Sequence, residues 1–261
     1  MKKTLITLGL GLSAIAMSSP FAGIHAIGTK SMEQAKPTIV LVHGAFADAN
    51  CWSKIIPPLE KKGYNVIAVQ NSLFSMEKDA ETTRRVIDAQ KGSVIVVGHS
   101  YGGAVMTTAA LGATNVKALV YVAAFAPDQD EVIMPLLQKY PSKLGTALVP
   151  DAAGFLYIAR DKFKDAFAAD VDPTERTVME TTQKPVNSQI FGHKFGAPAW
   201  KTIPSWYMIA TEDNAINPEL ERMFAKRMNA KTVELKASHV PMISKPNEVI
   251  KLIEEAAATV K

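Results

Sequence analysis

Six short, nearly continuous apolar runs recur along the chain, and the segments between them have a helical spacing of apolar positions. Runs of this length, rich in Val, Ile and Leu, are typical of strands in a parallel sheet that is covered on both faces. They predict strands over residues 38–42, 64–69, 93–97, 116–122, 206–210 and 231–235.

The intervening segments predict helices, and two of them carry start signals. Asn217 stands at the N-cap position before Pro218, and Pro246 directly precedes the last helical segment. Because strand alternates with helix, the expected fold class is α/β, with a mostly parallel, doubly wound sheet. The helices are expected over residues 78–90, 100–111, 217–228 and 247–260.

One long stretch interrupts this alternation. Between Pro127 and Ile203 no run predicts a strand, although the stretch is rich in Phe, Met, Tyr and Leu. A structureless loop of that length is uncommon in a compact domain. We interpret residues 127–200 as a helical cap over the C-terminal edge of the sheet, inserted into a core made of residues 37–126 and 201–261.

The N-terminus has the pattern of a secretory signal peptide. Lys2 and Lys3 precede an apolar run over residues 5–17, which small residues and Pro20 follow. The run is shorter than the roughly 20 apolar residues of a spanning helix. We therefore expect a signal peptide over residues 1–26, export to the periplasm or the medium, and no membrane span after cleavage.

Composition excludes several classes of function. The net charge is +4, and the Lys and Arg residues are spread along the chain, so no nucleic-acid footprint is expected. The single cysteine, Cys51, excludes an intramolecular disulfide. No HExxH, cysteine pair, Asp-rich loop or G-x-G-x-x-G is present, so neither a metal nor a nucleotide cofactor is expected. The sequence does not indicate an oligomeric state.

A candidate nucleophile lies directly after the third predicted strand. Residues 98–103 have the sequence GHSYGG, which contains the G-x-S-x-G nucleophile elbow between a strand and a helix, as the motif requires. The sharp turn places the serine hydroxyl at a helix N-terminus, where free N–H groups favour developing negative charge. Ser100 is therefore the expected nucleophile.

The serine needs a base, and chain order selects it. In this arrangement the order is Ser, acid, His. His239 follows the last strand and fits, whereas His193 lies in the expected cap and comes too early. The chain has five histidines in all: His25, His43, His99, His193 and His239.

The acid that orients His239 should follow a strand between the nucleophile and the base. Asp213 follows the fifth predicted strand and is the favoured candidate; Glu212 and Asp128 are the rivals. Adjacent side chains leaving a strand point in opposite directions, so only one of Glu212 and Asp213 can face the histidine.

An oxyanion needs two N–H donors. One is expected from Tyr101, the residue after the nucleophile. The other is expected from Ala45 in the loop after the first strand, where Gly44 permits the turn that aims this N–H at the site.

Together these segments resemble the α/β-hydrolase superfamily, in the branch of plant methylesterases, hydroxynitrile lyases and bacterial carboxylesterases such as pyrethroid hydrolases. The similarity spans roughly residues 38–260 and is weakest in the cap. The resemblance implies the triad Ser100, Asp213 and His239. Its motifs are VHGA at 42–45 with Trp52, the elbow, TED at 211–213 with Ile216 and Pro218, and SHVPM at 238–242 with KP at 245–246.

Two positions bear on the reaction. The hydroxynitrile lyases of this branch carry Thr directly after the first-loop histidine and Lys directly after the catalytic histidine. Here these positions are Gly44 and Val240, so the ammonium that would stabilise a cyanide leaving group is missing. The resemblance therefore favours hydrolysis over cyanohydrin cleavage.

The sequence thus predicts a serine hydrolase that cleaves a medium-sized, apolar carboxylic ester through an acyl-enzyme. A lactonase, perhydrolase or carbon–carbon hydrolase could use the same triad. A non-catalytic small-molecule receptor is the alternative outside enzymes.

Overall fold

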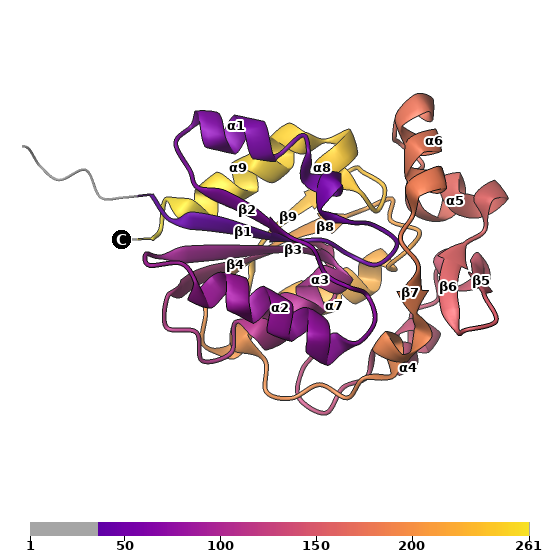
Figure 1. The fold of residues 1–261 in the computed structure, drawn as a ribbon, viewed down its shortest axis with the longest axis horizontal. Coiled ribbons are helices and arrows are strands. Elements are labelled where there is room, and N and C mark those ends of the chain that lie inside the picture. Colours follow the sequence, from indigo (N-terminus) through magenta and orange to yellow (C-terminus); the bar gives the residue numbers. More distant parts are fainter. Residues whose placement is uncertain (1–35, 261) are drawn as a thin grey trace, which may run out of the picture. The chain divides into compact units, whose positions relative to one another are not determined.

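The computed structural model describes residues 36–260, which are built around a six-stranded, wholly parallel sheet (Figure 1). The strand order is β2-β1-β3-β4-β8-β9, so the chain moves outward from β1 in one direction and then in the other. This is the doubly wound arrangement that the sequence predicts. The strands are β1 (Thr38–Val42), β2 (Val66–Val69), β3 (Val94–Ser100), β4 (Val116–Ala124), β8 (Ser205–Ala210) and β9 (Lys231–Leu235).

Helices cover both faces of the sheet, which is why its central strands are apolar throughout. All seven residues of β3 are buried. Each fully buried Val, Leu or Ile side chain contributes about 1.5–3 kcal/mol of transfer free energy. One face carries α1 (Ile56–Lys61), α8 (Pro241–Ser244) and α9 (Pro246–Ala257), and the other carries α2 (Met76–Asp88), α3 (Tyr101–Ala109) and α7 (Pro218–Arg227) (Figure 1).

The inserted segment is not the purely helical cap that the sequence predicts. It contains α4 (Ile133–Lys139), α5 (Arg160–Phe167) and α6 (Pro173–Thr182), but also an antiparallel sheet of β5 (Leu148–Pro150), β6 (Phe155–Ile158) and β7 (Val186–Asn187). These strands have only two to four residues and are largely half-buried or exposed, so they form no continuous apolar run. The expectation of an all-helical insertion is therefore wrong in this part.

Short 3₁₀ helices complete the connections, over Ala49–Trp52, Leu144–Thr146, Ser188–Gly192 and Ala199–Lys201. The six core strands and the four expected helices appear within three residues of their predicted bounds. The expected signal peptide over residues 1–26 lies outside the described residues. Within residues 36–260, none of the helices has the length and hydropathy needed to cross a membrane.

Candidate active site

Ser100 stands where β3 turns into α3, in a strained backbone conformation. Its φ of 52° and ψ of −125° are rare for a residue with a side chain, and strain of this kind gathers at functional sites. The turn is tight because the start of α3 packs on the end of β1: a Cβ at Gly102 would collide with the carbonyl oxygens of Val42 and His43. The elbow sequence therefore holds Ser100 in a fixed place.

His239 and Asp213 meet behind this turn as a buried pair. His239 Nδ1 lies 2.5 Å from Asp213 Oδ2, and the two residues are 1% and 5% exposed. Asp213 Oδ1 accepts the N–H groups of Ala215 (2.6 Å) and Ile216 (2.9 Å), which fixes the carboxylate. With its proton on Nδ1, His239 presents Nε2 as an acceptor, and within residues 36–260 this atom has no hydrogen-bond partner.

The rival acids lie elsewhere. Glu212 is half-exposed and pairs with Lys236 at 3.5 Å. Asp128 pairs with Lys201 at 2.5 Å. Of the three candidate acids, the structure brings Asp213 to the histidine, in agreement with the opposite directions of adjacent side chains.

The loop after β1 packs directly against the serine. A Cβ on Gly44 would lie 2.7 Å from the Ser100 Cβ, so only glycine fits there. His43 holds this loop: its Nε2 accepts the Asn71 N–H (3.0 Å), and its Nδ1–H donates to the Gly44 carbonyl (2.9 Å). Burial lowers the pKa of His43, which keeps the ring neutral and able to accept at Nε2.

Two backbone N–H groups border the space in front of Ser100. Ala45 and Tyr101 line the same cavity as the serine. Tyr101 is the first residue of α3, so its N–H has no partner inside the helix. Among residues 36–260, the Ala45 N–H donates to no protein acceptor. The two groups therefore have the hydrogen-bonding capacity that an oxyanion requires.

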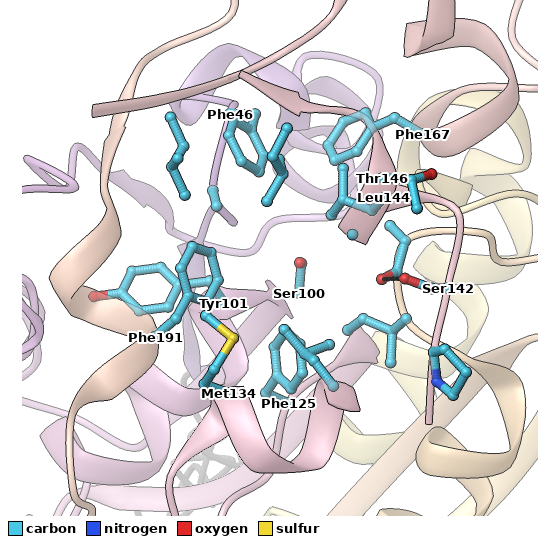
Figure 2. A pocket seen from close by; sticks show the side chains of 18 of the residues that line it. Phe46, Ser100, Tyr101, Phe125, Met134, Ser142, Leu144, Thr146, Phe167 and Phe191 are labelled. Carbon is cyan, nitrogen blue, oxygen red and sulfur yellow. Dashed lines mark hydrogen bonds between the residues drawn. The ribbon is translucent and has the colours of Figure 1, made fainter. Parts of the chain in front are cut away.

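The cavity that Ser100 lines has a volume of about 350 Å³, within the range of small-molecule sites (Figure 2). Phe167 lines it and packs edge-on against His239, with 5.0 Å between ring centroids, so the histidine contacts a side chain of the cavity wall. No charged side chain of residues 36–260 lines the cavity. The aromatic and long apolar side chains that line it are Phe46, Tyr101, Phe125, Met134, Leu137, Leu144, Leu148, Leu156, Phe167, Phe191 and Ile216.

A second cavity of about 280 Å³ lies beside the first and also has Phe46 and Phe167 in its wall. The two rings meet edge to face, with centroids 6.3 Å apart, and they separate the two spaces. In the part of the chain that the structure describes, no cluster of three His, Cys, Asp or Glu side chains could hold a metal ion.

The geometry of the elbow, the buried His–Asp pair and the fold agree with one family, and the sequence model of that family matches residues 39–252. The chain belongs to the alpha/beta hydrolase family. The resemblance inferred from the motifs is thereby confirmed. The match covers most of the described residues, including both segments of the core and the inserted segment between them.

Individual relatives of this hydrolase have low sequence identity to it, but the alignments cover nearly the whole length of each relative. A methylesterase of Arabidopsis thaliana, methylesterase 3, is 25% identical over 87% of this chain and 98% of its own. An alpha-hydroxynitrile lyase of the same plant is 27% identical over 83% and 95%. A solved pyrethroid hydrolase from Sphingobium faniae has a TM-score of 0.73 at 22% identity, covering 85% and 98%, and shows the shared fold. The family match and the methylesterase relative support an esterase-like hydrolase.

Sequence reasoning gave no role to His99, which the structure places against His239. His99 Nε2–H donates to the His239 backbone carbonyl (2.8 Å), and the two rings lie 4.7 Å apart. Burial, and secondarily the neighbouring His239, lowers the pKa of His99 well below its usual value. His99 is therefore a neutral support for the histidine, and no pattern in the sequence links two residues so far apart in the chain.

Sequence reasoning also missed Asp79, which ties the elbow of the hydrolase to α2. Tyr101 donates its hydroxyl to Asp79 Oδ2 (3.1 Å), while Asp79 Oδ1 accepts from the Ser72 N–H and hydroxyl (2.8 Å each) and the Leu73 N–H (3.1 Å). Burial, together with the Asp79 charge, raises the pKa of Tyr101, so its hydroxyl stays a donor. The side chain of the residue after the nucleophile is thus anchored to α2.

Proposed function

We propose that this hydrolase cleaves carboxylic esters through an acyl-enzyme on Ser100, with His239 as general base and Asp213 as the residue that orients it. The observation that carries the proposal is the buried His239–Asp213 pair, whose Nε2 has no partner among residues 36–260 and whose imidazole packs against Phe167 in the wall of the cavity that Ser100 lines. The structure has no hydrogen bond between the Ser100 hydroxyl and Nε2, and in hydrolases such contacts often form only in the substrate complex.

The reaction follows from these atoms. His239 Nε2 accepts the hydroxyl proton as Ser100 Oγ attacks the ester carbonyl, and Asp213 stabilises the imidazolium. The N–H groups of Ala45 and Tyr101 hold the oxyanion. His239 then gives the proton to the leaving alcohol, and water repeats the sequence to release the acid. Such acid–base help is worth about 10²–10⁴-fold, and one oxyanion donor about 10²–10³-fold.

The cavity supports a neutral, apolar ester of medium size. An anionic or cationic substrate would lose its hydration without gaining a charged partner, because no charged side chain of the described residues lines the wall. Two of the relatives act, by name, on methyl esters and pyrethroids. Ester hydrolysis is favoured over the lyase reaction because Val240, buried and apolar, follows the histidine.

The test is hydrolysis of p-nitrophenyl esters of increasing acyl length by the wild type, Ser100→Ala and Ser142→Ala. Ser142 lines the same cavity, but its hydroxyl donates to the Ala215 carbonyl, so it is a matched control. We expect Ser100→Ala alone to lose turnover and to escape acylation by a fluorophosphonate, as read by intact mass. Turnover by Ser100→Ala would overturn the mechanism.

Absence of ester turnover in the wild type would instead favour the other reactions open to this triad. Lactones and carbon–carbon substrates would then be assayed with the same variants. A wild type that binds apolar ligands but escapes acylation would be a receptor rather than an enzyme.

We further propose that the protein is exported and loses residues 1–26. The proposal is supported by the N-terminal sequence, in which two lysines are followed by an apolar run and then by small residues. Expression of the full chain in a bacterium, followed by fractionation and intact mass of the product, tests this. A cytoplasmic product that retains Lys2 and Lys3 would refute it.

A further inference from the structure

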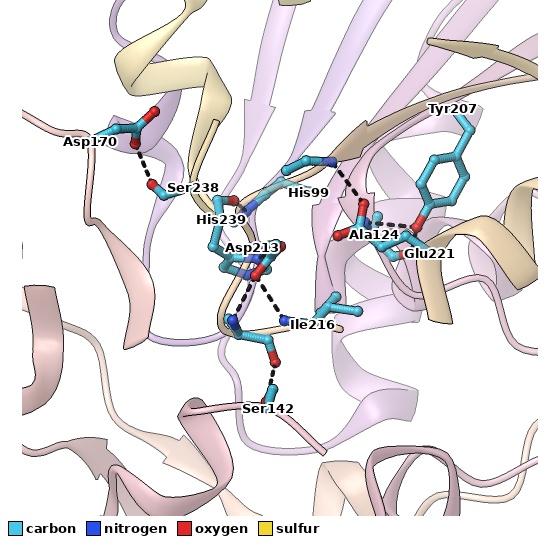
Figure 3. A network of polar contacts seen from close by, with 12 residues as sticks. His99, Ala124, Ser142, Asp170, Tyr207, Asp213, Ile216, Glu221, Ser238 and His239 are labelled. Atoms are coloured by element: carbon cyan, nitrogen blue, oxygen red, sulfur yellow. Dashed lines mark hydrogen bonds and ion pairs between the residues drawn. The ribbon is translucent and has the colours of Figure 1, made fainter. Parts of the chain in front are cut away.

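Glu221 is a buried carboxyl group next to the site that the proposed mechanism does not use. It lies on α7 and is 0% exposed. Its Oε2 accepts the N–H of Ala210 at 3.1 Å, and the carbonyl of Ala210 accepts the N–H of Asp213 at 3.1 Å. Glu221 is therefore tied to the same turn at the end of β8 that carries Asp213 (Figure 3).

The second oxygen of Glu221 lacks the partner that an ionised carboxylate needs. Within residues 36–260, no N–H or O–H group donates to Oε1, although the atom is buried. The carboxyl group beside it is Asp213, whose Oδ1 already accepts two N–H groups and whose Oδ2 accepts from His239. An ionised carboxylate can only accept, so two such groups satisfy one another only when a proton lies between them.

We propose that Glu221 is a positioning residue that keeps its proton and donates it from Oε1 in a hydrogen bond to the Asp213 carboxylate. The bond adds a third restraint to those from Ala215 and Ile216, and it turns the remaining lone pair of Asp213 toward His239. The orienting acid is then one half of a pair that carries a single negative charge.

The surroundings of Glu221 agree with a neutral carboxyl group. Burial, and then the charge of Asp213, raises its pKa well above the usual value. On β8, Tyr207 faces it with a hydroxyl that donates to the Ala124 carbonyl. On α7 the nearest cation is Arg222, whose guanidinium is exposed and engaged by Glu219 and Glu234. No cation in residues 36–260 forms an ion pair with Glu221.

The first test is spectroscopic and does not depend on turnover. Infrared difference spectra at pH 7 compare the wild type with Glu221→Gln and with Glu219→Gln, a control that removes an exposed carboxylate from the same helix. We expect the C=O stretching band of a protonated carboxyl group in the wild type and in Glu219→Gln, and its loss in Glu221→Gln. An identical band in all three proteins, or no band in any of them, would overturn the proposal.

The second test is the pH dependence of thermal stability. The unfolded chain releases the Glu221 proton near pH 4.3, whereas the folded protein retains it. The folded state therefore binds more protons, and stability falls as pH rises toward the folded-state pKa. We expect the Tm of Glu221→Gln minus that of the wild type to increase from pH 5 to pH 8, and that of Glu219→Gln to stay flat. If the Tm difference from the wild type does not change with pH for either variant, the folded protein does not retain a proton on Glu221.

The third test separates positioning from mere packing, and it alone rests on the proposed ester hydrolysis. Glu221→Gln retains a donor at the same place and is expected to keep most of the wild-type kcat. Glu221→Leu removes the donor, and displacement of the acid should lower kcat by about 10²-fold with little change in KM. Equal losses in both variants would overturn the positioning role. If Glu221→Leu fails to fold, the infrared spectra and the pH dependence of Tm for Glu221→Gln still test whether Glu221 is protonated.

Discussion

Replacement of Asp213 by Asn tests the orienting role most directly, because the two side chains have the same shape. Asp213 Oδ1 accepts two backbone N–H groups, and Oδ2 accepts from His239 Nδ1. In the variant, the amide oxygen must stay with the backbone donors, so the NH₂ group faces His239. Two donors cannot face one another, and His239 then shifts its proton to Nε2. The base thereby loses the lone pair that should accept the Ser100 proton.

The size of the effect follows from the same contacts. The opposite amide orientation would leave the N–H groups of Ala215 and Ile216 unsatisfied, at about 1–3 kcal/mol each. The wrong tautomer is therefore favoured by about 2–6 kcal/mol. Loss of the correct tautomer in a Ser-His-Asp site lowers kcat by about 10⁴-fold, which corresponds to about 5.4 kcal/mol of barrier.

The assay is single-turnover acylation by a p-nitrophenyl ester, with Glu212→Gln as the matched control. Glu212 is half-exposed and pairs with Lys236, so its variant should acylate at the wild-type rate. A loss of less than about tenfold in Asp213→Asn would refute the orienting role. A larger loss in Glu212→Gln than in Asp213→Asn would reassign the acid.

Three further outcomes are expected. Tyr101→Phe removes the hydrogen bond to buried Asp79 and should lower the free energy of unfolding in urea by about 1.5–3 kcal/mol. Burial lowers the pKa values of His43 and His99 in the folded state, so the folded protein loses stability as pH falls below about 6.5. The Tm of His99→Gln should therefore decrease less steeply than that of the wild type as pH is lowered below this value. Phe167→Ala joins the two cavities that this ring separates, and the acyl chain length with the highest kcat/KM should increase; an unchanged optimum would contradict the partition.

The parts of the site that the sequence predicts are those with local signals. The elbow is contiguous, and the candidate acid and base each follow a strand, so a parallel sheet brings their strand ends to one edge. Ser100, Asp213 and His239 are placed accordingly, and their roles in catalysis stay proposals. The α/β-hydrolase fold is confirmed, and the alternation of six strands with helices is what made it predictable from the sequence.

The parts that the sequence does not predict depend on contacts between distant residues or on elements too short for a pattern. His99 supports a histidine 140 positions away, and Tyr101 meets an aspartate 22 positions away. The inserted sheet contains a strand of two residues, Val186–Asn187, which has no periodicity to detect. Such features follow from packing of the whole chain rather than from local preference.

The contact between Gly44 and Ser100 limits how this protein could acquire another reaction. A Cβ at position 44 would lie 2.7 Å from the Ser100 Cβ and 3.0 Å from His99 Nδ1. A threonine at this position, which the resemblance associates with lyases, would be overpacked on the present backbone. Replacement of Gly44 by threonine alone would therefore impair hydrolysis without producing lyase activity. The loop after β1 must shift before a threonine can be accommodated at this position. Directed evolution toward cyanohydrin cleavage would thus have to vary residues 43–46 together.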